Sequence, residues 1–263
     1  MNKQNTLIAY IGFMYFLGGF ALQASQLDPG AQLFKAISSK DLEMVKHVVE
    51  QGAKVDYIPR SIHGPPLVLA ITEGNIPIIE YLLSQGALVD RRSYNGQTPL
   101  MIALARSTPA TAKILLEHQA HVNAQDLRGQ TPLMYAARNR EIPSVDSTKA
   151  LITQGAQVNT QDDEGLTALM HAVKAGNTDI VKYLLTLGTL NVNTKTKNEK
   201  TALTLAKEKF IETKDPRYQE IGRMLIKRLG LIGPEGKLSK TGLLQTGLPA
   251  EILESISTFM LEK

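Results

Sequence analysis

Residues 126–137 have the sequence Asp126-Leu127-Arg128-Gly129-Gln130-Thr131-Pro132-Leu133-Met134-Tyr135-Ala136-Ala137. The Asp and Gly at its start are typical of a tight turn. Thr131 and Pro132 predict the first turn of a short helix, because a Thr hydroxyl can accept from early helical amides and Pro needs no amide there. The two alanines allow a second helix to approach closely, and about twenty residues later the unit ends at Gly155-Ala156.

The same pattern recurs along the chain every 33 to 36 residues. Its leucine is found at Leu67, Leu100, Leu133, Leu169 and Leu203. A second landmark, usually Gly-Ala, keeps the same spacing from Gly52-Ala53 to Gly188-Thr189. Two landmarks that stay in step indicate a repeat protein. Motif and period together resemble the ankyrin repeat.

The resemblance implies an all-α solenoid of stacked ankyrin repeats, each a helix–turn–helix with a β-hairpin finger. We expect an ankyrin repeat domain over 28–230 with about six repeats, the outer two degenerate: 28–60, 61–92, 93–125, 126–161, 162–195 and 196–230. Met101, Met134 and Met170 replace the His that in this family links neighbouring repeats by hydrogen bonds. Met would fill the same space without the polar link.

The composition fits a protein with a sizeable core and excludes several kinds of site. Hydrophobic residues make up 43% and charged residues 21% of the 263 residues, which are ordinary values for a soluble protein. The absence of Cys excludes disulfides, thiolate metal sites and a Cys nucleophile. The net charge of +4 is too modest to indicate nucleic-acid binding, so we predict no nucleic-acid partner.

Residues 1–24 have the pattern of a secretory signal peptide. A short, weakly positive start precedes a 16-residue apolar run, Leu7 to Leu22, with cleavage sites after Ala21 or Ala24. This predicts an exported chain, secreted or periplasmic. The alternative is an uncleaved membrane anchor holding an envelope scaffold, although a spanning helix needs about 20 apolar residues. A third interpretation of residues 1–24 is a buried helix that caps the repeats.

The C-terminal residues form two segments. Residues 231–247 contain glycines and one Pro and are predicted to be a linker. Residues 248–263 predict an amphipathic helix, and their pattern resembles the start of an F-box, carried by Leu248, Pro249, Glu251, Ile252, Leu253, Ile256 and Phe259. That resemblance implies docking on a host Skp adaptor by a secreted effector-type protein that couples a target to a host ubiquitin ligase. Only three residues follow Met260, so the later F-box helices are missing, and the alternative is a helix that caps the last repeat.

The catalytic inventory of the sequence is poor. His118 and His121 are three residues apart but flank a turn, where we expect them to be exposed. We interpret Asp162-Asp163-Glu164 as a solvated loop rather than a cation site. Residues 233–237 fail the phosphate-loop pattern, which requires Ser or Thr where Leu238 stands. The sequence therefore predicts a protein that is not an enzyme, with no cofactor and no metal.

The predicted function is non-catalytic protein binding through a concave groove, which the resemblance implies is lined by the fingers and by the exposed ends of the first helices. The corresponding residues are Arg92, Tyr94, Asn95, Gln97, Arg106, Leu127, Arg128, Gln130, Arg138, Asp163, Glu164, Leu166 and Lys174. Packing in a repeat stack does not require these side chains, and Arg and Tyr are enriched at interface hot spots. The arginines favour an acidic partner, while the alternative is an ordinary basic, soluble face. The partner's identity cannot be read from the fold.

Overall fold

The computed structural model describes residues 28–58, 64–106, 108–139 and 145–231. They fall into two units that divide between Ser93 and Tyr94, and each is described by itself below. The predicted signal peptide, most of the predicted linker, and the F-box-like or capping helix of 248–263 lie outside the described residues. Within the described ranges, no helix has the length and apolar character needed to cross a bilayer.

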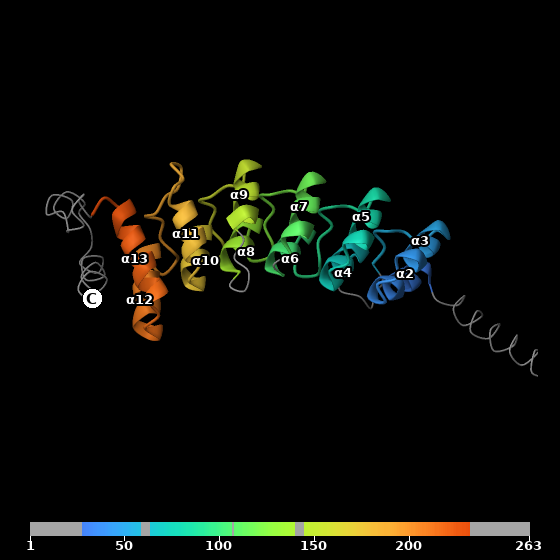
Figure 1. The fold of residues 1–263 in the computed structure, drawn as a ribbon, viewed down its shortest axis with the longest axis horizontal. Helices are drawn as coiled ribbons and strands as arrows, with labels where there is room; N and C mark the ends of the chain where they lie inside the picture. Colours follow the sequence, from blue (N-terminus) through green and yellow to red (C-terminus); the bar gives the residue numbers. More distant parts are fainter. Residues whose placement is uncertain (1–27, 59–63, 107, 140–144, 232–263) are drawn as a thin grey trace, which may run out of the picture. The chain divides into compact units, whose positions relative to one another are not determined.

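The first unit contains four described helices, α2 (Pro29–Ser38), α3 (Leu42–Glu50), α4 (Pro66–Glu73) and α5 (Ile76–Ser84) (Figure 1). Helix α2 packs against both α3 and α4, and α4 packs against α5. The second helix of each pair has a side-chain cap, because Asp41 accepts from the amide of Met44 and Asn75 from that of Ile78.

The second unit continues the same pattern with helices in two rows (Figure 1). The first helices of the repeats are α6 (Pro99–Ala105), α8 (Pro132–Arg138), α10 (Ala168–Ala175) and α12 (Ala202–Thr213), and each packs on the next. The second helices are α7 (Pro109–Glu117), α9 (Val145–Thr153), α11 (Thr178–Leu184) and α13 (Pro216–Arg228), which also pack on one another in order. The predicted all-α stack of helical pairs is therefore confirmed within each unit.

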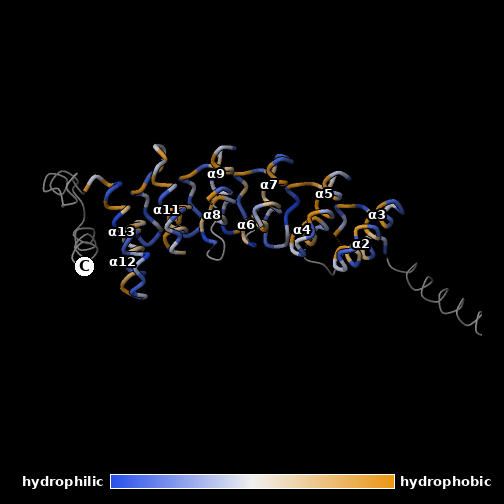
Figure 2. Tube along the Cα trace, viewed as in Figure 1, coloured by the Kyte–Doolittle hydropathy of each residue, from blue (hydrophilic) through white to orange (hydrophobic). Residues whose placement is uncertain are grey.

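The core of each unit is formed by the residues that set the sequence period. The five leucines of the repeat landmark are 0 to 2% exposed. Figure 2 shows hydrophobic residues concentrated in helical segments such as α4 and α5, with more hydrophilic residues along α13. The landmark leucine thus marks the same core position in successive repeats, as the repeat hypothesis requires.

The methionines that replace the family's histidine fill the core, as predicted. Met101, Met134 and Met170 are buried. The Sδ atoms of Met101 and Met134 also lie 3.4 Å from the backbone nitrogens of Thr98 and Thr131, so each thioether accepts a weak hydrogen bond within its own repeat. These two methionines therefore retain a local polar contact that we did not predict.

The predicted Thr caps form at most of the first helices. The hydroxyls of Thr98, Thr167 and Thr201 accept from the amide three residues later at 3.3 to 3.4 Å. In the stretch 126–137 the prediction is wrong, because the buried Thr131 hydroxyl has no hydrogen-bond partner among the described residues. There the Met134 amide donates to the Thr131 carbonyl instead.

The fingers are turns, and no strand occurs in the part of the chain that the structure describes. Two backbone bonds close the finger at 126–130, Asp126 N to Gln130 O at 3.0 Å and Gly129 N to Asp126 O at 3.1 Å, and the finger at 162–166 repeats them with Asp162 N to Leu166 O and Gly165 N to Asp162 O. Successive fingers are also joined, since Asp163 N donates to Arg128 O. In each of these two fingers one bond joins the two sides of the turn, and a single bond is too few to form the predicted β-hairpin ladder.

Asparagine side chains link successive repeats of the second unit. Asn123 accepts from the Gln157 amide at 2.8 Å and donates to the Gly155 carbonyl at 3.0 Å. Asn177, which is buried, donates to the carbonyls of Ala137 and Asn139, each at 2.7 Å. These bonds satisfy backbone groups at turns and helix ends, where helical partners are lacking.

Candidate protein-binding surface

The structure brings most of the predicted groove residues together on one surface of the second unit. We call this surface the finger face and define it by Tyr94, Asn95, Gln97, Leu127, Arg128, Arg138 and Lys174. Tyr94 and Leu127, at the tips of successive fingers, are 80% and 74% exposed. Arg106, Asp163 and Glu164 are also exposed, whereas Arg92 belongs to the first unit. Large exposed apolar side chains beside polar ones are typical of binding surfaces.

Two predicted groove residues are buried. Leu166 is only 4% exposed, so its side chain belongs to the core and the prediction that it contacts a partner is wrong. It follows Gly165, whose left-handed backbone (φ +78°) turns the chain back toward α10. Gln130 is also buried, yet it contributes to the finger face by holding another side chain.

A polar network below the finger face fixes Tyr135 of α8. The Tyr135 hydroxyl donates to Asp126 Oδ2 at 2.8 Å and accepts from Gln97 Nε2 at 2.6 Å. Asp126 Oδ1 accepts from the backbone amides of Arg128 and Gln130, which shapes the finger. Burial raises the pKa of Tyr135, and its bond to Asp126 acts in the same direction. The phenol therefore stays neutral and serves as a rigid platform.

Arg138, the last residue of α8, lies on that platform. Its Cζ atom is 4.0 Å from the centroid of the Tyr135 ring, within the range of a cation–π contact. Its Nη1 donates to Gln130 Oε1 at 2.8 Å. The guanidinium is half-buried and held from two sides, so its position is set before any partner arrives.

The next repeat contains an equivalent network built on His171. Asp162 Oδ1 accepts from the amides of Glu164 and Leu166, and Oδ2 lies 2.8 Å from His171 Nε2. Burial lowers the pKa of His171, and the nearby charges of Arg138 and Lys174 lower it further, against the effect of Asp162. We therefore assign a neutral imidazole that donates to the Asp162 carboxylate.

Asp126, Tyr135, Asp162 and His171 were not among the predicted groove residues, and Asp162 was interpreted as part of a solvated loop. Asp162 is buried, so that interpretation is wrong. The signal available in the sequence was a pairing nine residues apart, Asp126 with Tyr135 and Asp162 with His171, that recurs in successive repeats.

The finger face encloses a small pocket. Its volume is about 340 Å³, and its lining residues come from two fingers and from α8: Asn95, Gln97, Asp126, Leu127, Arg128, Gln130, Tyr135 and Arg138. Most of them are polar, and Leu127 supplies the apolar edge. A polar hollow of this size can take one or two side chains of a partner.

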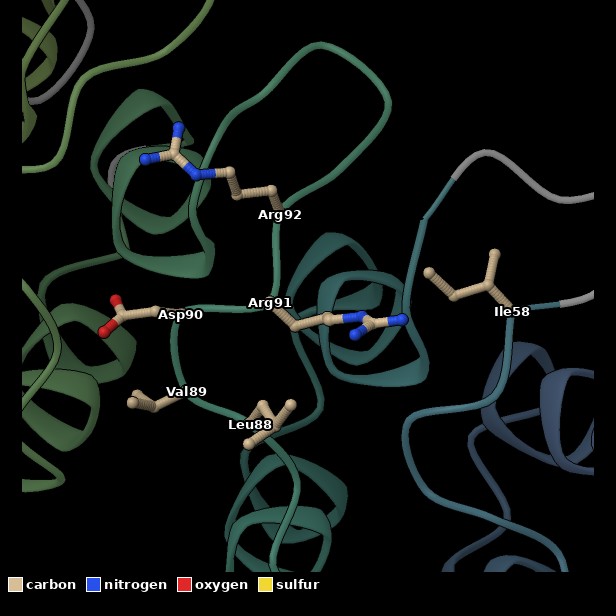
Figure 3. A pocket seen from close by; sticks show the side chains of 6 residues that line it. All are labelled: Ile58, Leu88, Val89, Asp90, Arg91 and Arg92. Atoms are coloured by element: carbon tan, nitrogen blue, oxygen red, sulfur yellow. The ribbon is translucent and has the colours of Figure 1, made fainter.

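The first unit has a separate pocket, which contains the predicted residue Arg92. Its volume is about 640 Å³, and Ile58 and residues 88–92 line it. Figure 3 shows Arg91 extending toward Ile58, while Arg92 and Asp90 extend to the other side of the loop. The structure therefore separates Arg91 from Arg92, although the two are adjacent in sequence.

The described residues contain no group of three or more His, Asp or Glu side chains arranged to hold a metal ion. His118 and His121 are exposed, as expected. The finger face carries hydrogen-bond donors, acceptors and apolar tips.

Comparisons with known proteins agree with the repeat pattern. A family model described as "Ankyrin repeats (3 copies)" matches residues 67–162 and 143–230. The chain is 32% identical over 79 residues to "Arf-GAP with coiled-coil, ANK repeat and PH domain-containing protein 2" of Rattus norvegicus and Homo sapiens. It is 32% identical over 77 residues to "2-5A-dependent ribonuclease" of Mus musculus. These matches cover 30% and 29% of this chain and 10% of each relative, so the similarity is confined to a small part of those proteins.

Proposed function

The chain belongs to the ankyrin-repeat family, and on that premise we propose that its second unit binds a protein partner through the finger face. Ankyrin repeats are in general protein–protein interaction modules. The observation that carries the proposal is the pair of exposed apolar fingertips, Tyr94 and Leu127, beside a pocket with a prepositioned arginine. Exposed aromatic and arginine side chains on a rigid support have the character of interface hot spots.

The fingers are rigid enough to present these side chains in one arrangement. Besides the bond between Asp163 N and Arg128 O, Lys197 N donates to Glu164 O at 3.0 Å. Leu127 lies directly over the preceding finger, where a Cβ on Gly96 would be 2.8 Å from Leu127 Cγ. A surface ordered in the free protein loses little conformational entropy when a partner binds.

Affinity capture with paired variants tests the proposal. The full chain is immobilised beside a Tyr94→Ser/Leu127→Ser double variant and a control, Ile211→Ser, which removes an exposed apolar residue of α12. We expect a partner retained by the wild type and the control to be lost from the double variant, with unchanged circular dichroism for all three. Equal retention by the double variant would place the binding surface elsewhere.

We also propose that residues 1–24 direct export of the chain. The support is the pattern of charge, apolar run and small residues alone. Mass spectrometry of the N-terminus of the native protein tests it: a start at Leu22 or Ser25 supports export, and a start at Met1 in a membrane fraction supports the anchored scaffold.

The adaptor role remains a proposal that rests on the F-box-like pattern of 248–263. It requires a eukaryotic host that supplies the Skp adaptor. Replacing Leu248, Pro249 and Ile252 should abolish binding to that adaptor and leave the repeats folded, whereas a capping helix predicts lower stability of the last repeat instead.

A further inference from the structure

We propose that the pocket around Arg138 binds the carboxylate of an Asp or Glu side chain in an acidic segment of the partner protein. The inference rests on the proposed function, since it specifies the partner's chemistry at the same surface. It follows from a guanidinium that is fixed in place but lacks a carboxylate partner.

Arg138 makes far fewer polar contacts than its chemistry allows. A guanidinium carries five N–H donors. Within the described ranges Arg138 makes one hydrogen bond, from Nη1 to Gln130, and no acidic oxygen lies within 4.0 Å to form a salt bridge. The Tyr135 ring covers one face of the planar group and Arg138 lines the pocket, so the N–H donors that remain can serve a ligand there. A carboxylate is the ligand that matches this planar donor set.

The two carboxylates of the networks beside Arg138 are already occupied. Asp126 accepts three hydrogen bonds, from the amides of Arg128 and Gln130 and from the Tyr135 hydroxyl. Asp162 accepts from two amides and from His171. Moving either carboxylate to Arg138 would break the turn that it holds, so neither of these two buried network acids is available to pair with the arginine.

Several basic residues elsewhere in this unit have acidic partners. Lys113 pairs with Glu117 on α7, and Lys149 lies near Asp146 on α9. Arg128, Arg138 and Lys174 form no such pair among the described residues, and Arg138 and Lys174 both act electrostatically on His171. These three cations of the finger face thus differ from Lys113 and Lys149, which each have an acidic partner on their own helix.

The neighbouring side chains define the rest of the partner's segment. Leu127 borders the pocket and Tyr94 projects from the preceding finger, so an apolar residue next to the acidic one would find contacts there. Asp163 and Glu164 are exposed on the following finger and would repel acidic residues. The segment thus places its carboxylate near Arg128 and Arg138 and its neutral or basic residues near Asp163.

A phage-displayed library of linear peptides, selected on the full chain, supplies the probe for a test. The best peptide is synthesised with each acidic residue in turn changed to the amide, and binding is measured by fluorescence anisotropy. The protein variants are Arg138→Gln and, as a matched control, Lys113→Gln on α7. Because the peptide change leaves the protein untouched, the result does not depend on how well Arg138→Gln folds.

We expect the selected peptides to share an Asp or Glu next to an apolar residue. Loss of a charged hydrogen-bonding pair should weaken binding about tenfold to a hundredfold when the key acid becomes an amide. The same peptide change should cost much less on Arg138→Gln, and Lys113→Gln should behave like the wild type.

Three outcomes would overturn the inference. The first is that the selected peptides lack acidic residues, and the second is that the amide change costs as much on Arg138→Gln as on the wild type. The third is that no selected peptide depends on the finger face. If such peptides still lose binding to Tyr94→Ser/Leu127→Ser, the proposed function stands and only the carboxylate site fails. If no selected peptide depends on the finger face, both fail.

Discussion

Replacing Asn177 with Ala should lower the free energy of unfolding by about 2 to 4 kcal/mol. The Asn177 side chain is buried at the start of α11 and donates two 2.7 Å hydrogen bonds to carbonyls where α8 ends, in the preceding repeat. Losing the bond whose carbonyl then meets water costs about 1 kcal/mol, and leaving the other carbonyl buried without a partner costs about 1 to 3 kcal/mol. The estimate assumes that water satisfies one of the two carbonyls.

Urea unfolding followed by circular dichroism measures this change. Asn198→Ala is the control, because Asn198 is exposed on a finger, and its effect should stay within about 0.5 kcal/mol. Asn177→Asp separates donation from size, since a carboxylate cannot donate to the two carbonyls and should destabilise at least as much as Ala. A loss below about 0.5 kcal/mol for Asn177→Ala, or wild-type stability for Asn177→Asp, would refute the reasoning.

Two further predictions concern the networks below the finger face. Burial lowers the pKa of His171 below its ordinary 6.5, so the unfolded chain takes up a proton first as the pH falls. The contribution of neutral His171 to the free energy of unfolding is therefore complete above pH 6.5 and declines below it. The urea midpoint should fall more between pH 7.5 and 5.5 for the wild type than for His171→Gln, and parallel curves would exclude His171 as the cause. Gly165→Ala should destabilise more than Gly155→Ala, because both have φ > 0 but a Cβ at Gly165 would lie 2.8 Å from Lys197 N, whereas Gly155 faces open space. Equal effects in urea unfolding would show that close finger stacking contributes nothing.

The repeat architecture could be predicted because each repeat carries its own local signals. Leu133 and its equivalents mark the buried face of each first helix, and Pro132 and Pro216 mark helix starts, so period and motif are enough to place the helical pairs. The Asp215 cap of α13, which accepts from the Arg217 amide at 2.9 Å, follows the same local logic.

Side chains whose environment depends on how a finger folds back onto the helix that follows it could not be placed in the same way. Leu166 and Glu164 are two residues apart in one finger, yet one is buried and the other exposed. Asp162 looks like any loop acid until α10 brings His171 against it. Arg138 was predicted as a groove residue, but its fixation by Tyr135 and Gln130 depends on the finger folding back onto α8.

We propose above all that a protein partner binds the finger face of the second unit. Hydrogen–deuterium exchange of the full chain, with and without a captured partner or selected peptide, tests it most directly. When the partner or peptide is bound, we expect slower exchange in residues 94–97 and 127–130 and unchanged exchange in α7 and α9. Protection confined to those second helices, with the fingers unchanged, would contradict it.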